Sequence, residues 1–266
     1  MIVTDSFVVL NFPRTGSTFV RSVLHGLRPR RWDPRRLLGG PPPALHGFRE
    51  LILPIDRTAN AERLGRRSQH GRWGQIPESH RHLPVVSVVR HPLDHAVSTF
   101  MHDLWRKQPP VDEATLRRRF PRWPDLPFGE FLGFLHEFAL PDTLKGVRPA
   151  AEIGWTTAQF LRFYGRDPDA LLASATDARI DSGELARELP PIRWLRHHRL
   201  TEDLIDFLGE MGCSRRQLDR VRNRPRENVS SGRERQPWRS FFTPEQERLA
   251  RHRERLLFGM FPDLGE

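Results

Sequence analysis

Short apolar runs of strand length alternate along the chain with segments whose apolar residues recur at helical spacing. The runs at 8–10, 83–89 and 192–195 are β-branched or bulky and predict buried strands. Helical spacing recurs after the first run and again over 128–140, 151–164 and 202–211. The alternation predicts an α/β fold with three layers, in which helices flank a central, mostly parallel sheet. The 266 residues show no repeat, and we expect one domain over 1–266.

Proline and arginine gather in the stretches between these elements. The stretches 28–43 and 107–127 predict loops or irregular excursions, and 221–242 predicts a loop because it lacks apolar periodicity and carries six arginines. Thr243-Pro244-Glu245 predicts a helix start, with Thr243 as the N-cap. Aromatic residues near the second stretch either wall an acceptor pocket or, as is commoner, pack the loop down: Phe120, Trp123 and Phe128.

The sequence PRTGST at 13–18 joins the first predicted strand to a helix. Gly16 lets the backbone approach a ligand closely, and free amide groups at the helix N-terminus favour a phosphate or sulfate. The loop is P-loop-like but shorter than a Walker loop, since it has one glycine and lacks the Gly-Lys-Ser/Thr ending. A turn of this kind also connects α/β elements that bind nothing, and the loop alone does not decide between the two.

A second polar segment, RHPLDHAVS at 90–98, follows the second predicted strand. Ligands of open α/β sheets bind at the carboxyl ends of strands, so Arg90 and Ser98 are expected at the same crevice as the loop. The planar fork of Arg90 suits a terminal phosphate. The alternative for Arg90 is an ion pair with a nearby carboxylate. Two anion sites on neighbouring strands predict a ligand with two separated anionic groups.

The overall charge is strongly positive. The chain has 43 Lys and Arg residues against 33 Asp and Glu, a net charge of +10, which is typical of proteins with anionic partners. A compositionally biased genome produces the same arginine excess. Cys213, the single cysteine, excludes an internal disulfide and is expected to be small, buried and apolar. No apolar run approaches a membrane span and the first ten residues lack a basic region, so we expect a cytoplasmic protein without a membrane partner.

The two polar segments together resemble the motifs of sulfotransferases that use 3′-phosphoadenosine 5′-phosphosulfate (PAPS). Their 5′-phosphosulfate loop reads P-K-S-G-T-T-W, to which PRTGSTF at 13–19 is similar. Their 3′-phosphate motif reads R-N-P-x-D-x-x-V-S, and the segment 90–98 has the same spacing. A weaker resemblance covers the rest, including 194–204. The resemblance to this family implies a P-loop-like nucleotide-binding core, PAPS as co-substrate and no requirement for a metal.

The resemblance also implies roles for individual residues. It implies a 5′-phosphosulfate cradle made by Arg14, Thr15, Gly16, Ser17 and Thr18. Phe19 would lie near the adenine, and Arg90 and Ser98 would hold the 3′-phosphate. His70 stands where the family has its catalytic histidine, with His46 as a fallback base. Near the C-terminus, Arg233 is the candidate for a further 3′-phosphate contact, with Arg235 behind it.

Three positions depart from the family pattern. Arg14 replaces the loop lysine, so its role would be electrostatic, because an arginine is too basic to give up a proton. Ser68 stands where the family has a second lysine, two residues before the histidine. The C-terminal arginine is displaced relative to Trp238.

The function predicted from the sequence is transfer of the sulfuryl group of PAPS to a hydroxyl of a small molecule or a saccharide, in line and with a histidine base. One alternative is a kinase-like phosphotransferase with an atypical P-loop. Another is a noncatalytic basic nucleic-acid-binding protein, which lacks any recognisable reading motif and makes nucleic acid an unlikely partner. His91 and His95, like His80 and His82, have a spacing that suits metal ligands, but a structural role is favoured because no companion ligands accompany them.

Overall fold

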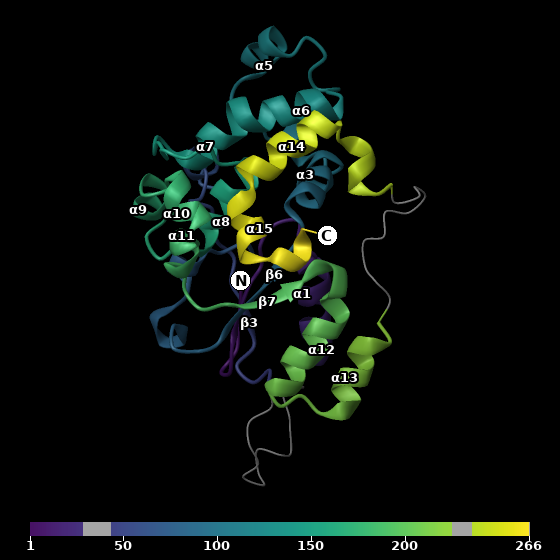
Figure 1. Ribbon diagram of the computed structural model, residues 1–266. Coiled ribbons are helices and arrows are strands. Elements are labelled where there is room, and N and C mark those ends of the chain that lie inside the picture. The colour runs from purple at the N-terminus through teal and green to yellow at the C-terminus, as the bar shows by residue number, and fades with distance from the viewer. Residues whose placement is uncertain (29–43, 225–235, 266) are drawn as a thin grey trace.

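The computed structural model describes residues 1–28, 44–224 and 236–265. Within them a five-stranded sheet has the order β3-β1-β2-β6-β7 (Figure 1). Its strands are β1 (Ile2–Val3), β2 (Val8–Leu10), β3 (Arg49–Glu50), β6 (Val85–Val89) and β7 (Arg193–Arg196). Strands β2, β6 and β7 run parallel, with Leu10 beside Ser87 and Ser87 beside Trp194. Strand β1 is antiparallel to both β2 and β3.

The parallel centre confirms the three strands predicted from the apolar runs. The antiparallel edge was not predicted, because β1 and β3 span two residues each and two residues carry no readable periodicity. A hydroxyl network ties the centre together inside the protein: Tyr164 lies 2.7 Å from Ser87 Oγ, which donates to the Leu10 carbonyl at 2.6 Å.

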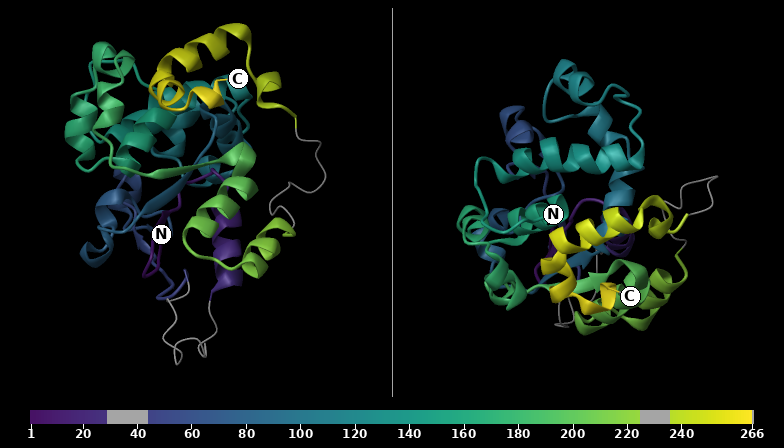
Figure 2. Two further views of the ribbon diagram at one scale, coloured as in Figure 1. Left: turned by 60° about the horizontal axis from the view of Figure 1, so that its bottom comes forward. Right: turned by 45° about the horizontal axis from the view of Figure 1, so that its top comes forward.

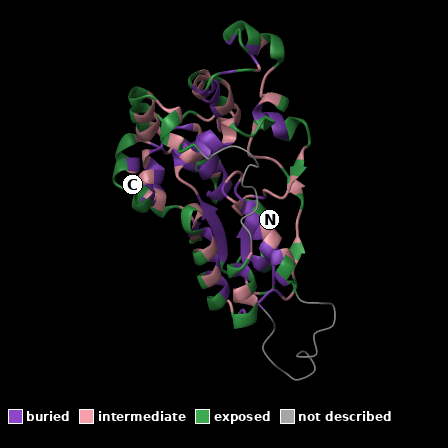
Figure 3. Ribbon diagram, turned by 90° about the vertical axis from the view of Figure 1, so that its right-hand side faces the viewer, coloured by how far each residue is buried: buried purple, intermediate pink, exposed green. Residues whose placement is uncertain are grey.

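Helices cover both faces of the sheet (Figure 2). On one face lie α1 (Ser17–Leu27), α12 (Leu200–Glu210) and α13 (Arg215–Arg222), packed on inward residues such as Val9 and Val86. On the other lie α8 (Trp155–Tyr164) and α15 (Arg255–Met260), packed on Val8 and Leu10. Because successive strand residues point to opposite faces, the continuous apolar runs supply both cores, and Figure 3 shows these strands buried. The three-layer α/β architecture is confirmed.

The predicted helices are present with shifted ends. The segment 128–140 forms α6 (Phe128–Phe134), which continues through a π-helical turn (Leu135–Ala139) into α7 (Leu140–Leu144). Thr243 caps α14 (Pro244–Arg253) by accepting a hydrogen bond from the Gln246 amide at 3.2 Å, as predicted. Further helices and strands are β4 (Leu53–Pro54), α2 (Ala59–Arg63), β5 (Arg67–Ser68), α3 (Pro92–Phe100), α4 (Leu104–Lys107), α9 (Pro168–Ala173), α10 (Asp177–Asp181) and α11 (Glu184–Arg187).

The prediction of loops over 107–127 and 221–242 is wrong in part. The stretch 107–127 contains α5 (Glu113–Arg119), capped by Asp112, whose side chain accepts from the Thr115 amide at 2.9 Å. The helix buries only Leu116, so apolar periodicity does not reveal it. The stretch 221–242 begins inside α13 and includes a 3₁₀ turn at Trp238–Phe241. Arg233 and Arg235 lie outside the described residues, as does most of 28–43.

The aromatic residues of the excursion pack it down, which is the commoner of the two explanations offered by the sequence. Phe120, Trp123 and Phe128 are buried in one aromatic cluster with residues of α3, α4 and α6. Cys213 is buried as expected. Among the helices of the described residues, none combines the length and the apolar character that crossing a membrane requires.

A buried carboxylate joins the C-terminal helices to α8. Glu254 precedes α15 and accepts hydrogen bonds from the Thr156 amide at 3.1 Å, the Thr157 amide at 2.7 Å and the Thr157 hydroxyl at 2.6 Å. These amides belong to the first turn of α8, where N–H groups lack helical acceptors. A Cβ on Gly154 would lie 2.1 Å from Glu254 Oε1, so the glycine makes room for the carboxylate.

Glu254→Ala is expected to lower the free energy of unfolding by about 3 kcal/mol, because it leaves buried amides without acceptors. Glu254→Gln keeps one acceptor oxygen and is expected to lose about half as much. Glu210→Ala, which removes an exposed carboxylate paired with Arg193, is the matched control and is expected to cost under about 1 kcal/mol. Urea denaturation measures all three, and equal losses for Glu254→Ala and Glu210→Ala would contradict the capping role.

Candidate functional site

The loop between β2 and α1 leaves the N-terminus of α1 without a side-chain cap. Gly16 is the N-cap residue, with a left-handed φ of 93° that favours glycine. A methyl group there would lie 2.7 Å from Leu200 Cδ2, so the loop also lies close against the start of α12. Among the described residues, the amides of Gly16, Ser17 and Thr18 have no acceptor, and the first turn holds no acidic residue. Free amides at a helix N-terminus are the donors that an anion binds.

The side chains of the loop point in different directions. Thr15 is buried and its hydroxyl donates to the Phe12 carbonyl at 2.9 Å, so it stabilises the turn. Ser17 is buried and Thr18 is exposed. Phe19 is 6% exposed and lies in the core between the sheet and α12, so its ring would have to leave that core to touch a bound base. A contact between Phe19 and the adenine stays a prediction.

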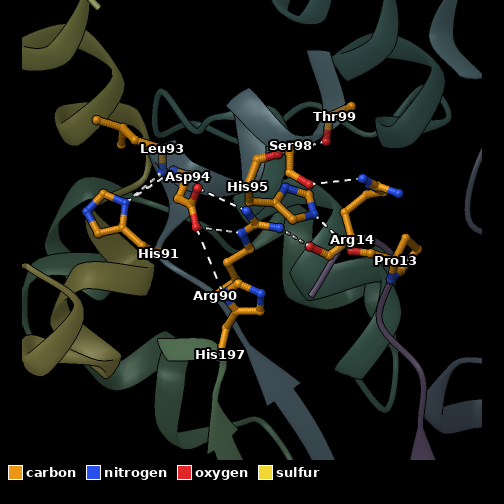
Figure 4. Close-up of polar contacts among 10 residues, drawn as sticks. All are labelled: Pro13, Arg14, Arg90, His91, Leu93, Asp94, His95, Ser98, Thr99 and His197. Atoms are coloured by element: carbon orange, nitrogen blue, oxygen red, sulfur yellow. Dashed lines mark hydrogen bonds and ion pairs between the residues drawn. The ribbon is translucent and has the colours of Figure 1, made fainter. Parts of the chain in front are cut away.

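Arg90, at the end of β6, lies against the loop (Figure 4). Its Nη1 donates to the carbonyl oxygen of Arg14 at 2.8 Å, which joins residues 76 positions apart. Its Nε and Nη2 donate to the two carboxylate oxygens of Asp94 at 2.7 and 2.9 Å. The alternative reading of Arg90, an ion pair with a nearby carboxylate, is therefore realised, and so is the expected proximity to the loop.

The ion pair leaves part of the Arg90 guanidinium available. Arginine has five N–H donors, and the contacts with Asp94 and Arg14 use one on Nε and one on each terminal nitrogen. Within the described part of the chain, one N–H on each terminal nitrogen of Arg90 remains for an anion. The carboxylate pairing therefore does not remove the capacity to bind phosphate.

Arg14 and Ser98 also meet at this point. Arg14 Nη2 donates to Ser98 Oγ at 3.1 Å, and Figure 4 shows the two side chains beside Arg90. Arg14 has no carboxylate partner among the described residues, so the two guanidinium groups and Asp94 together carry one uncompensated positive charge. Burial and the charge of Arg90 lower the pKa of Arg14. This excess charge in a half-buried place attracts an anion.

His70 lies beside the same end of β2. Its Nδ1 is 2.6 Å from the carbonyl oxygen of Asn11, and because a carbonyl only accepts, Nδ1 carries the hydrogen. Burial, followed by the charge of Arg57, lowers the pKa of His70 to about 4. The ring is therefore neutral at pH 7 and its Nε2 has an available lone pair, which is the form that a general base requires.

Other histidines have structural contacts. His46 pairs with Asp5, which lies before β2, so the fallback base is at the amino end of β2 and the loop is at its carboxyl end. His91 caps α3 by accepting from the amides of Leu93 and Asp94 at 3.2 and 3.3 Å, whereas His95 contacts the Pro13 carbonyl. In the described part of the chain no group of three or more metal-ligating side chains comes together.

Sequence reasoning missed two contributors to the site. Asp94 has a signal, since it lies four residues after Arg90 at a helix start, where such pairs form. His197 Nδ1, at the end of β7, is 4.0 Å from Asp94 Oδ2. No pattern within the sequence brings β7 to this place; the parallel pairing of β6 and β7 does.

One hollow lies at the site, and another lies beside part of the segment 107–127. A small enclosed cavity of about 10 Å³ is lined by Thr15, Arg90, His95 and Thr156, among others. A larger open hollow of about 420 Å³ lies over α5 and α6, lined by Arg119, Phe120 and Glu130 among others. Phe120 thus borders a hollow as well as the core, but Arg90 and the loop do not line it.

Comparison with known proteins yields a distant structural likeness and no match of sequence or family. No family model matches the chain, and no curated protein matches its sequence. Among solved structures, mouse sulfotransferase SULT7A1 complexed with PAP is similar, with 13% sequence identity and a TM-score of 0.42 over 96% of this chain and 84% of that one. At this identity and TM-score the likeness assigns no function.

Proposed function

We propose that this protein is a PAPS-dependent sulfotransferase that transfers the sulfuryl group to a hydroxyl of a small molecule or a saccharide. The observation that supports it most is the contact between Arg90 Nη1 and the Arg14 carbonyl at 2.8 Å. This contact joins two segments that follow neighbouring parallel strands. One segment resembles the family's motif for the 5′-phosphosulfate of PAPS, and the other resembles its motif for the 3′-phosphate. The proposal combines this geometry with the motif resemblance.

The proposed binding mode assigns one phosphate group to each motif. The amides of Gly16, Ser17 and Thr18, with Arg14, hold the 5′-phosphosulfate at the N-terminus of α1. The unused N–H groups of Arg90 and the hydroxyl of Ser98 hold the 3′-phosphate. In this mode the ribose lies between the ends of β2 and β6.

In the proposed reaction the acceptor oxygen forms a bond to sulfur while the bond from sulfur to the 5′-phosphate oxygen breaks. Negative charge develops on the departing adenosine 3′,5′-bisphosphate, where Arg14 and the loop amides stabilise it. His70 Nε2 accepts the proton of the acceptor hydroxyl. Arg14 acts by charge alone, since its proton stays on the guanidinium.

The alternatives make different demands on the site. A kinase-like phosphotransferase would need a lysine in the loop, which Arg14 replaces, and it has no use for an anion site at Arg90 and Ser98. A nucleic-acid binder would need a run of exposed cations along a groove. Arg90 and Arg14 are instead both partly buried, and they are joined through the Arg14 carbonyl.

The transfer reaction tests the proposal directly. The protein is incubated with sulfur-labelled PAPS and a panel of hydroxylated small molecules and saccharides, and in parallel with γ-labelled ATP. We expect label to pass from PAPS to at least one acceptor and none to pass from ATP. Transfer from ATP alone would contradict the proposal and favour the kinase-like alternative.

Arg90→Ala is expected to remove the preference for adenosine 3′,5′-bisphosphate over AMP, because it removes the proposed 3′-phosphate contact. A charge-assisted contact of this kind is worth about 2 kcal/mol, or about 30-fold in affinity. Arg118→Ala, at an exposed arginine of α5, is the control and should keep the preference. Titration calorimetry gives the two constants for each variant, and an unchanged ratio in Arg90→Ala would remove Arg90 from the 3′-phosphate site.

A further inference from the structure

Two consecutive carbonyl groups of the loop are held by side chains from the β6–α3 segment. His95 Nε2 lies 3.0 Å from the carbonyl oxygen of Pro13, and Arg90 Nη1 donates to the carbonyl oxygen of Arg14 at 2.8 Å. Figure 4 shows the histidine and the arginine approaching the loop from one side. The loop backbone is therefore fixed at two adjacent peptide groups by α3 and by the end of β6.

The fixed carbonyls determine where the next amides point. In a trans peptide the C=O of one residue and the N–H of the next point in opposite directions, so the amides of Arg14 and Thr15 face away from His95 and Arg90. Neither amide has an acceptor among the described residues. Arg14 has a left-handed φ of 64°, and a left-handed residue in a turn brings successive N–H groups together into an anion-binding concavity.

The His95 ring is held rigidly in one protonation form. It is 1% exposed, stacks on Phe12 with centroids 5.5 Å apart, and lies 5.8 Å from the Trp155 ring. Because the Pro13 carbonyl only accepts, Nε2 carries the hydrogen. Burial lowers the pKa of His95 to about 4, so the ring is neutral at pH 7. Nδ1 is buried and has no partner in the described residues, which makes the Pro13 contact the ring's hydrogen bond to the protein.

We propose that His95 is a positioning residue of the anion loop: its Nε2–H holds the Pro13 carbonyl and so directs the Arg14 and Thr15 amides toward the bound anion. That the anion is the 5′-phosphosulfate rests on the proposed function. His95 touches neither nucleotide nor acceptor in this scheme. It acts through the backbone of the loop, in which His95 and Arg90 each hold one carbonyl group.

Substitutions that separate the hydrogen bond from the volume of the ring test this role. His95→Leu fills much of the space and donates nothing. His95→Gln is the conservative variant, since its amide nitrogen reaches the place of Nε2, whereas His95→Asn places the amide near Nδ1 and falls short. His82→Leu, at an exposed histidine, is the matched control.

The first readout is the order of the loop in the free protein, measured as ¹⁵N relaxation order parameters of the Arg14 and Thr15 amides. We expect order parameters of about 0.85 in the unmodified protein, His95→Gln and His82→Leu, and order parameters below about 0.6 in His95→Leu and His95→Asn. Rigid loop amides in both His95→Leu and His95→Asn would overturn the proposal. So would a glutamine variant as mobile as the leucine variant.

The second readout is binding of adenosine 3′,5′-bisphosphate and of AMP. His95→Leu is expected to weaken both about tenfold, because both carry a 5′-phosphate, and to leave their ratio unchanged because Arg90 is intact. If His95→Leu bound AMP as tightly as the unmodified protein but lost the preference for the bisphosphate, the result would contradict a role of His95 at this loop. If the unmodified protein does not prefer the bisphosphate, the proposed function fails, while the order parameters still decide the role of His95.

Discussion

Arg14→Ala is expected to lower kcat/KM for sulfuryl transfer from PAPS by about 10²- to 10³-fold, the usual effect of removing one donor that stabilises charge in the transition state. Arg14 has no carboxylate partner among the described residues and carries the uncompensated positive charge of the site. Alanine at this left-handed position has the same backbone requirement as arginine, so the loss would report on the guanidinium and not on new strain.

Arg14→Lys is the informative control for this prediction. Lysine retains the charge, and it is the residue at this position in the sulfotransferase motif that the loop resembles. Most of kcat/KM is therefore expected to remain. Initial rates at several PAPS concentrations separate kcat from KM for both variants. A fall in Arg14→Ala that is confined to KM would show that the residue binds ground state and transition state equally.

His70→Ala is expected to lower kcat at least tenfold while the affinity for adenosine 3′,5′-bisphosphate stays nearly intact. The reason is geometric, since His70 Nδ1–H is held by the Asn11 carbonyl at 2.6 Å, which leaves Nε2 to accept a proton. His82→Ala is the control at an exposed histidine. Unchanged turnover in His70→Ala would place the base elsewhere.

The pH profile gives a second test of His70. Its pKa is lowered to about 4, so the base form is complete at neutral pH and is lost only as the pH falls toward that value. We expect kcat/KM to stay flat from pH 8 down to about pH 6 and then to fall at lower pH. A half-maximal point near the ordinary histidine value of about 6.5 would contradict the buried, neutral state.

The parallel centre of the sheet and the proximity of the two polar segments, 13–18 and 90–98, were predictable because they depend on local signals. Runs such as 85–89 are apolar on both faces, and the turn at 13–18 contains the glycine that its left-handed backbone favours. Parallel pairing of β2 and β6 then brings Arg90 to the loop, as the rule for strand ends predicts.

The parts that sequence reasoning missed depend on tertiary contacts. The edge strands β1 and β3 have two residues each, and α5 buries only Leu116, so neither leaves a periodic signal. The sequence around His95 indicates only a spacing that suits metal ligands or a structural role. The actual partner of His95 is the Pro13 carbonyl, 82 positions away, and such a contact is set by the packing of α3 against the loop.

The most direct test of the account is calorimetric titration of the unmodified protein with adenosine 3′,5′-bisphosphate, AMP and ATP under the same salt conditions. The two proposed anion sites, joined through the Arg14 carbonyl, predict that the bisphosphate binds about 30-fold more tightly than AMP and also more tightly than ATP. Equal affinities for the bisphosphate and AMP would contradict the proposed binding of a nucleotide through both its 5′- and 3′-phosphate groups.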